Sequence, residues 1–485
     1  MTLHFSELIL YTGFKDKLVN VDTLIKNGQV VLETGITRLN VGIRNGKIVV
    51  LADDTSDITA TEIIDATDKL VIPGAIDIHF HCRAPAYPQR GDFATETRAA
   101  AAGGVTTIFE MPISKPCCAT GDIFRMRKAL GEKDCYVNFG LYAAPGLLDP
   151  AEIEDMVNEG AIAFKIFMTA APKGRDDEFE GLCLPDVEGL YQALKLVAET
   201  GLVCAVHAEN NQLLEWHMQE LINAGRNDVP AHGESRPPHV EALAIATLLT
   251  LNESIGANLH IAHLSAKEPL EVFRRFKATG STATAETCPH YLFFTETDLE
   301  RVGPYAKINP PLRKEADQQA LWGGLMDGSL LAITTDHSPF MVEEKERART
   351  DIWATPPGAP GVEELLLGVM NEALNGRITI NKAVELISTN GAKRFGVYPE
   401  RGHIGINAMA DIVIFDPNDE TTIHTDMLFT KAKECDKLYE GMTFKGKVNQ
   451  TLVNGKTIFK DGEIVGQAGD GQFIRPNPAN VSKEF

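Results

Sequence analysis

Short apolar segments, each followed by a stretch rich in Ala, Leu and Glu, recur through the middle of the chain from about residue 71 to about residue 393. After LVIPGAIDIHFHCR come VTTIFEMP, VNFGLYAA, IAFKIFM, VCAVHAE, LHIAHLS, TATAETCPHY and LLAITTDHSP. Because alternating strands and helices pack as a parallel sheet, about eight such units predict a closed (β/α)8 barrel. In that architecture, catalytic side chains lie at the carboxyl ends of the strands.

Both ends of the chain have another pattern, in which β-branched runs are joined by Asn-Gly pairs. The runs are TLIKNGQVVL and RLNVGIRNGKIVVLADD near the start, then ADIVIFDP and GKVNQTLVNGKTIFKDGEIVG near the end. An Asn-Gly pair between apolar runs predicts a β-hairpin turn. Since 485 residues exceed what one hydrophobic core organises, we expect a TIM barrel at 72–393 and a small β-sandwich domain built jointly from residues 1–71 and 394–485.

The composition narrows the classes of partner. The formal net charge is -21, and the Lys and Arg residues are scattered, so we expect no nucleic acid and no anionic membrane surface. The eight cysteines form no CxxC pair, which indicates reduced thiols. The first residues lack the pattern of a secretory signal, and no apolar run of about 18 residues occurs. These features predict a soluble protein of the cytoplasm.

Near its end, the segment LVIPGAIDIHFHCR has two histidines, His79 and His81, with one residue between them. Side chains at this spacing on a strand point to the same side, so both imidazoles can bind one cation. A lone H-x-H is a weak signal, because two ordinary polar residues at a strand end explain it as well. It gains weight because later predicted strands also end in metal-binding side chains.

These later candidates are Lys165 in AIAFKIFM, His207 in VCAVHAEN, His263 in LHIAHLS and Asp336 in LLAITTDHSP. A lysine inside FKIF is costly to bury as an ammonium ion, so its charge is compensated or its amine is neutral. A neutral amine can take up CO2 and become a carbamate, an anionic bidentate metal ligand. The alternative for Lys165 is an ion-paired lysine, or one that reaches solvent with its amine.

Imidazoles, a carbamate and a carboxylate together match the donor set of two divalent cations. Two ions about 3.5–4 Å apart can share a hydroxide and polarise a scissile carbonyl. Asp336 can bind one ion and also move a proton from the attacking water to the leaving nitrogen. The pattern therefore predicts a hydrolase with a binuclear metal centre.

These residues, in this order, resemble the cyclic amidohydrolases of the metal-dependent amidohydrolase superfamily, which include hydantoinase or dihydropyrimidinase, allantoinase and dihydroorotase. The resemblance covers almost the whole chain after about residue 21, through GAIDIHFH, AAAAGGVTT, FKIFM, VHAEN, AHLS, ETCPHYL, PPLR and TTDHSP. It implies zinc as the usual metal and six ligands: His79, His81 and Asp336 for the first ion, His207 and His263 for the second, and carbamylated Lys165 between them.

Two residues are candidate substrate contacts. Arg83 stands where dihydroorotases have an arginine that binds the substrate carboxylate in a bidentate pair, although this chain has Ile113 and Ser114 where the dihydroorotase motif continues with Asn. The alternative for Arg83 is an ion pair at a surface or an interface. Asn309, in KINPPLR, is expected near the ring amide, which its side chain or its backbone can bind.

The other motifs do not fit a single subfamily. FKIFM, VHAEN, SRPP, ETCPHYL and the Leu321-Trp322 pair favour hydantoinases and allantoinases, yet Ala170 stands where hydantoinases have a Tyr that supports the oxyanion. The residues after His81 also differ from the Asn-Glu-Pro-Gly-like run of allantoinases. We expect a hydantoinase- or allantoinase-like hydrolase that opens a small cyclic amide or imide, with dihydroorotase activity through Arg83 as the alternative.

A third interpretation is a non-catalytic scaffold like the dihydropyrimidinase-related proteins, which keep the fold and lose metal ligands. This chain retains all six, and its metal content would decide the question. The family resemblance further implies a homodimer or homotetramer.

Overall fold

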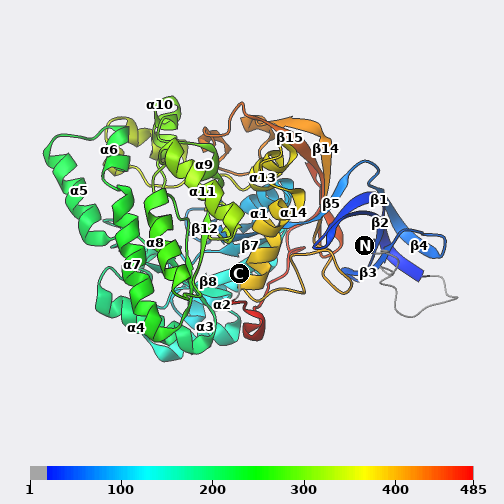
Figure 1. Cartoon of the computed structure of the whole chain (residues 1–485), viewed down its shortest axis with the longest axis horizontal. Coiled ribbons are helices and arrows are strands. Elements are labelled where there is room, and N and C mark those ends of the chain that lie inside the picture. Colours follow the sequence, from blue (N-terminus) through cyan, green and yellow to red (C-terminus); the bar gives the residue numbers. More distant parts are fainter. Residues whose placement is uncertain (1–18, 484) are drawn as a thin grey trace.

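The computed structural model describes residues 19–483 and residue 485. Residues 1–18 lie outside the described residues. The sequence analysis assigns them to the start of the β-sandwich domain and expects no secretory signal in them. The described residues contain an eight-stranded parallel sheet and a nine-stranded mixed sheet, which lie side by side along the long axis of the molecule (Figure 1).

The eight-stranded sheet forms the barrel, and its strands follow one another in chain order. They are β6 (Ala75–Phe80), β7 (Val105–Glu110), β8 (Asn138–Ala143), β9 (Ala163–Phe167), β10 (Val203–His207), β11 (Asn258–Ile261), β12 (Thr284–Thr287) and β13 (Ala332–Ile333). A parallel bridge between Phe80 and His337 joins the last strand region to the first, and the His81 N–H donates to the His337 carbonyl at 2.9 Å. The predicted (β/α)8 fold is confirmed.

Helices follow the strands and cover the barrel (Figure 1). They begin where the sequence supplies a cap: the Asp186 side chain accepts from the Gly189 N–H, and Asp92 forms a capping box with Thr95. The longer helices are α1 (Phe93–Ala102), α2 (Gly121–Asp134), α3 (Pro150–Glu159), α4 (Val187–Thr200), α5 (Asn211–Asn223), α7 (Pro238–Ile255), α8 (Lys267–Ala278), α11 (Glu315–Asp327) and α13 (Leu365–Leu374). The short ones are α6 (Val229–Glu234), α9 (Pro289–Phe293), α10 (Asp298–Val302), α12 (Val342–Glu346), α14 (Ile380–Val384) and α15 (Asn390–Arg394).

The nine-stranded sheet takes strands from both parts of the chain that flank the barrel. They are β1 (Val19–Leu32), β2 (Gly35–Arg44), β3 (Lys47–Ala52), β4 (Ile58–Asp65), β5 (Leu70–Pro73), β14 (Ile412–Thr422), β15 (Thr443–Val453), β16 (Lys456–Lys460) and β17 (Glu463–Ile464). Strands β5 and β14 pair antiparallel, with Val71 opposite Ile414. This is the β-sandwich domain built from both chain ends. Its boundaries at 71 and 394 stay predictions.

The Asn-Gly pairs do not all act as predicted. Asn45-Gly46 and Asn454-Gly455 have positive φ at both residues and connect paired strands, as hairpin turns do. Asn27-Gly28 lies inside β1, at a register shift against β2, so the hairpin prediction there is wrong. The cause is close packing: a Cβ at Gly28 would lie 2.3 Å from Val71 Cγ2, so the pair forms a bulge that lets β5 approach.

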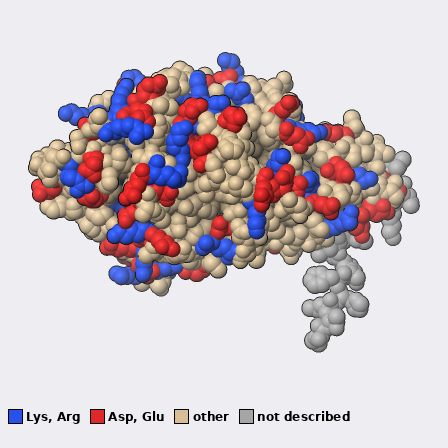
Figure 2. Space-filling view, turned by 90° about the horizontal axis from the view of Figure 1, so that it is seen from above, with Lys and Arg blue, Asp and Glu red and all other residues tan. Residues whose placement is uncertain are grey.

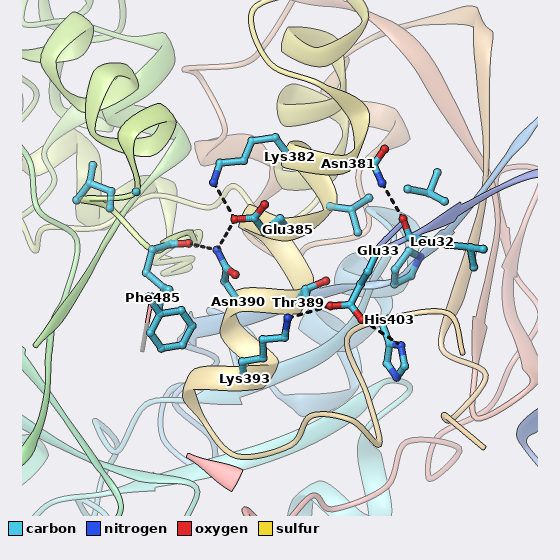
Figure 3. A pocket seen from close by; sticks show the side chains of 16 residues that line it. Leu32, Glu33, Asn381, Lys382, Glu385, Thr389, Asn390, Lys393, His403 and Phe485 are labelled. Atoms are coloured by element: carbon cyan, nitrogen blue, oxygen red, sulfur yellow. Dashed lines mark hydrogen bonds and ion pairs between the residues drawn. The ribbon is translucent and has the colours of Figure 1, made fainter. Parts of the chain in front are cut away.

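A pocket of about 330 Å³ lies where the barrel strands begin, beside Leu331 just before β13 (Figure 3). Its charged side chains pair with one another. Lys393 Nζ donates to Glu33 at 2.8 Å, and Lys382 Nζ donates to Glu385 at 2.8 Å. This strand-start pocket is therefore polar but internally satisfied.

On the surface shown in Figure 2, basic and acidic side chains are intermixed over the whole face. The described part of the chain has no helix that is both long enough and apolar enough to cross a membrane. All eight cysteines are free thiols, and most of them are buried.

Candidate metal centre

Three of the predicted ligands meet where the first and last barrel strands end. His79 is on β6, His81 follows it directly, and Asp336 follows β13. Asp336 Oδ1 lies 3.3 Å from His79 Nε2 and 3.1 Å from His81 Nε2. Adjacent strand ends of a closed barrel meet at one rim, so these residues lie together although they are far apart in sequence. Their donor atoms face one another at a spacing that suits a single cation.

The other two histidines form a second pair at the same rim. His207 is the last residue of β10, and His263 follows β11. His207 Nδ1 lies 3.0 Å from His263 Nε2, close to the ~3.3 Å that separates two nitrogens bound to one tetrahedral zinc. The rings of His79 and His263 are 5.2 Å apart, so the two groups are neighbours.

Lys165 lies in β9, fully buried, and its Nζ has no hydrogen-bond partner among the described residues. Burial lowers the pKa of this amine to about 8, even though Glu286 and Asp336 act in the opposite direction. An isolated buried ammonium is costly, and a buried polar atom without a partner calls for an explanation. A carbamate on Lys165 that binds metal ions would supply one. The residues present therefore fit a pair of divalent cations.

Two buried carboxylates hold the histidine ligands, and sequence reasoning did not single them out. Glu286 Oε1 lies 2.6 Å from His79 Nδ1, and Glu209 Oε2 lies 2.7 Å from His207 Nε2. Glu209 also pairs with Arg236. A carboxylate on the far nitrogen fixes the tautomer and orientation of a metal-binding imidazole. Both glutamates belong to motifs named above, ETCPHYL and VHAEN. Their position beside strand-end histidines is the sequence feature that could have identified them.

Asp77 links the two strands that carry the first group of ligands. Its carboxylate accepts from the hydroxyls of Thr334 and Thr335, each at 2.5 Å, and from the Thr335 N–H at 3.1 Å. Burial raises the pKa of Asp77 to about 6. This bonding joins β6 to the end of β13 and so fixes His79 relative to Asp336.

The backbone is strained at the same rim. His263 and Asp336 have φ of 37° and 49°, and Arg83 has 59°. Non-glycine residues seldom adopt this left-handed region, and such strain concentrates at functional sites.

Arg83 lies two residues beyond His81 and is buried. Its Nη2 donates to Ser338 Oγ at 2.7 Å, its guanidinium lies 4.8 Å from the Phe340 ring, and Nη1 is 4.0 Å from Glu178. Its Nε and Nη1 atoms have no hydrogen-bond partner within the described chain. Burial lowers the pKa of Arg83 to about 9. The side chain is therefore not a surface ion pair.

Asn309 lies at the other side of the barrel mouth, just before the α11 region. Its amide group is within 3.2 Å of Arg236 Nη2 and 3.1 Å of His232 Nε2. Because Arg236 also pairs with Glu209, Asn309 is connected to the support of His207. Its side chain is thus engaged by protein groups.

Comparisons with known proteins agree with this geometry. The model of the Amidohydrolase family matches residues 70–458. The chain is 36% identical to a D-hydantoinase from Rhizobium radiobacter, over 93% of this chain and 98% of that protein, and 34% identical to an allantoinase from Rubrobacter xylanophilus, over 93% and 97%. The solved structure of the L-hydantoinase (dihydropyrimidinase) from Arthrobacter aurescens superposes with a TM-score of 0.88 at 32% identity, over 93% of this chain and 99% of that one. The chain therefore belongs to the amidohydrolase family, within its cyclic amidohydrolases.

Proposed function

We propose that this protein is a hydrolase that opens a cyclic amide or imide ring, with hydantoinase- or allantoinase-like activity and two divalent metal ions, zinc for preference. The observation that carries the proposal is the buried amine of Lys165, which has no hydrogen-bond partner among the described residues and is near enough to all four candidate histidines to lower their pKa. Curated relatives that match nearly the full chain are named hydantoinases and allantoinase.

A pair of divalent ions would be held by His79, His81 and Asp336 on one side and by His207 and His263 on the other, with carbamylated Lys165 between them. Bound there, such ions supply Lewis acidity for the scissile carbonyl and an activated hydroxide for attack. The histidines bind as neutral imidazoles, because burial lowers the pKa of each of them.

The protein's own proton carrier in this proposal is Asp336. Its Oδ1 atom lies at the edge of the ligand group, and its side chain is 12% exposed, more than either histidine beside it. A carboxylate in this place can take a proton from the attacking water and deliver it to the departing ring nitrogen. Glu286 and Glu209 do not move protons. They orient His79 and His207.

One observation favours a second candidate, a dihydroorotase-like reaction on a ring that carries a carboxylate. The Nε and Nη1 atoms of buried Arg83 lack hydrogen-bond partners among the described residues, so the guanidinium keeps donors that can bind a carboxylate. Arg175 and Arg90 lie near enough to lower the pKa of Arg83 further, while Glu178 and Asp336 act in the opposite direction. An anionic substituent on the ring would be compensated there.

Metal analysis of the purified protein, together with ring-opening assays on hydantoin, dihydrouracil, allantoin and dihydroorotate, tests the proposal. About two zinc ions per subunit and turnover of one ring support it and identify the substrate. Two metal ions without turnover would leave the site but reject these four rings. A protein without metal would reject the hydrolase and favour the scaffold.

We further propose a cytoplasmic location and a homodimer or homotetramer. Free thiols at all eight cysteines suit a reducing compartment. Fractionation of cells, and the mass of the purified protein in solution, test these two points.

A further inference from the structure

His290 is a buried histidine that the proposed mechanism does not use. It is the second residue of α9, which begins directly after β12, so it lies at the same barrel rim as the ligands. It is 6% exposed, and its Nε2 atom has no hydrogen-bond partner among the described residues. The carboxylate of Asp336 is close enough to raise the pKa of His290 against the larger, opposite effect of burial, and His290 in turn lowers the pKa of His263.

Other buried histidines of the described chain show how unusual this is. His232 bonds the Ile308 carbonyl, His260 contacts Thr284 and Glu286, and His337 contacts Glu96. Buried ring nitrogens that lack a partner occur at only three histidines of the described part: His81, His263 and His290. Two of these are candidate metal ligands, so unpaired histidine nitrogens are confined to this rim among the buried histidines of the described part.

The imidazole of His290 packs edge-to-face on the Tyr291 ring, and the hydrogen bonds that position α9 do not use it. The hydroxyl of the next residue, Tyr291, donates to the Pro310 carbonyl at 2.7 Å, and Trp322 Nε1 donates to the Leu292 carbonyl at 3.3 Å. These bonds hold α9 in place. A buried polar atom without a hydrogen-bond partner costs about 1–3 kcal/mol in a folded protein. Because the imidazole of His290 carries this cost and positions no other element by a hydrogen bond, we expect it to bond a molecule that enters the site.

We propose that His290 is a substrate-binding residue whose imidazole hydrogen-bonds the amide edge of the ring. This inference rests on the proposed ring-opening function and adds a specificity to it. A neutral imidazole presents one N–H donor and one acceptor nitrogen. Nε2 is the unpaired atom of His290, and with the proton on Nδ1 it can accept from the ring N–H, so the site would select rings whose N–H next to the carbonyl is unsubstituted.

The test compares wild type, His290→Ala and His290→Gln in the metal-loaded protein, with His239→Ala on the exposed face of α7 as the control. The substrate is the ring that wild type turns over among hydantoin, dihydrouracil, allantoin and dihydroorotate. The N-methylated forms of that ring are assayed beside it. For His290→Ala we expect wild-type metal content and a kcat/KM about 30- to 300-fold lower, since one hydrogen bond to a developing charge is lost. The preference for the N–H ring over its N-methylated form should shrink, which a merely structural role would not produce.

His290→Gln should recover part of kcat/KM and of the N–H preference, because its amide keeps a donor and an acceptor. His239→Ala should behave as wild type. The inference is overturned if His290→Ala keeps kcat/KM within threefold, if it keeps the full N–H preference, or if it loses metal, which would make His290 a ligand.

Calorimetric binding of the same rings separates failure of this inference from failure of the proposed function. Wild type that binds a ring without turnover rejects hydrolysis of that ring. His290→Ala then still tests the contact by affinity, with an expected loss of about 10-fold or more. Wild type that binds none of the rings overturns both.

Discussion

The two ends of the barrel carry polar clusters of opposite kinds. Where the strands begin, the strand-start pocket holds Glu33, Lys382, Glu385 and Lys393, and each of these charges is paired (Figure 3). Toward the strand ends, Lys165 is buried, and its amine has no hydrogen-bond partner among the residues that the structure describes. The first cluster satisfies itself, whereas the second needs atoms from outside the chain.

This difference separates a polar pocket from a functional one. A pocket of about 330 Å³ opens at the strand-start end. Hydrogen-bond accounting points to the other end, since folded proteins seldom leave buried polar groups unpaired. A cavity shows only that space exists. An unpaired buried amine indicates that a binding partner is missing.

The largest effect that the comparison predicts is at Lys165. Lys165→Ala should remove at least one metal ion per subunit and lower turnover by about 10⁴-fold, because the bridging ligand is lost. The matched change in the strand-start pocket, Lys393→Ala, should leave metal content and turnover unchanged. Metal analysis and kcat on both proteins check this. Full retention of both ions in Lys165→Ala would rule out the proposed carbamate bridge.

Asp336→Asn comes next. The amide keeps an oxygen for metal binding but cannot accept the proton, so most of the metal should stay while kcat falls by about 10³-fold. Glu385→Gln, at the opposite end of the barrel, is its isosteric control. A near wild-type rate in Asp336→Asn would mean that another group moves the proton.

A smaller loss is expected when a supporting carboxylate is removed. Glu286→Ala leaves His79 without its 2.6 Å partner, so metal affinity should fall by about 10–100-fold. Titration against a zinc-buffered series measures this, with Glu434→Ala on the surface as the control. Unchanged affinity would show that packing alone orients His79.

Arg83→Met sharpens the question of substrate. Loss of a charge-assisted contact should lower kcat/KM on anionic dihydroorotate by roughly tenfold more than on neutral hydantoin. Parallel assays of the two rings measure the ratio. Equal losses on both would mean that Arg83 does not recognise a carboxylate.

The smallest effect belongs to the strand-start pocket itself. Glu33→Gln removes a partly exposed pair with Lys393, so the free energy of unfolding should fall by only about 0.2–1 kcal/mol. Denaturant unfolding of the metal-loaded protein checks it. A clear loss of turnover would show that this pocket is coupled to the metal centre, and the contrast between the two ends would fail.

The barrel could be predicted from its repeated apolar runs, and the candidate ligands could be named because each sits in a local motif within or at the end of such a run, as with Lys165 in FKIF. Contacts that depend on the packing of residues far apart in the sequence could not be predicted. Glu286 reaches His79 across the barrel, and no spacing in the sequence reveals that contact. The same holds for Gly28, where the close approach of Val71 from another strand turns a hairpin signal into a bulge.

The pairing of β5 with β14 has a consequence for how the chain acquires its structure. Val71 pairs with Ile414, so the edge of β5 stays open until the entire barrel and the strand beyond it have left the ribosome. Unpaired strand edges recruit other chains, and such long-range pairing is slow to form. The first-made strands of this protein are therefore its last to be completed, and that interval is when the nascent chain is most exposed to aggregation.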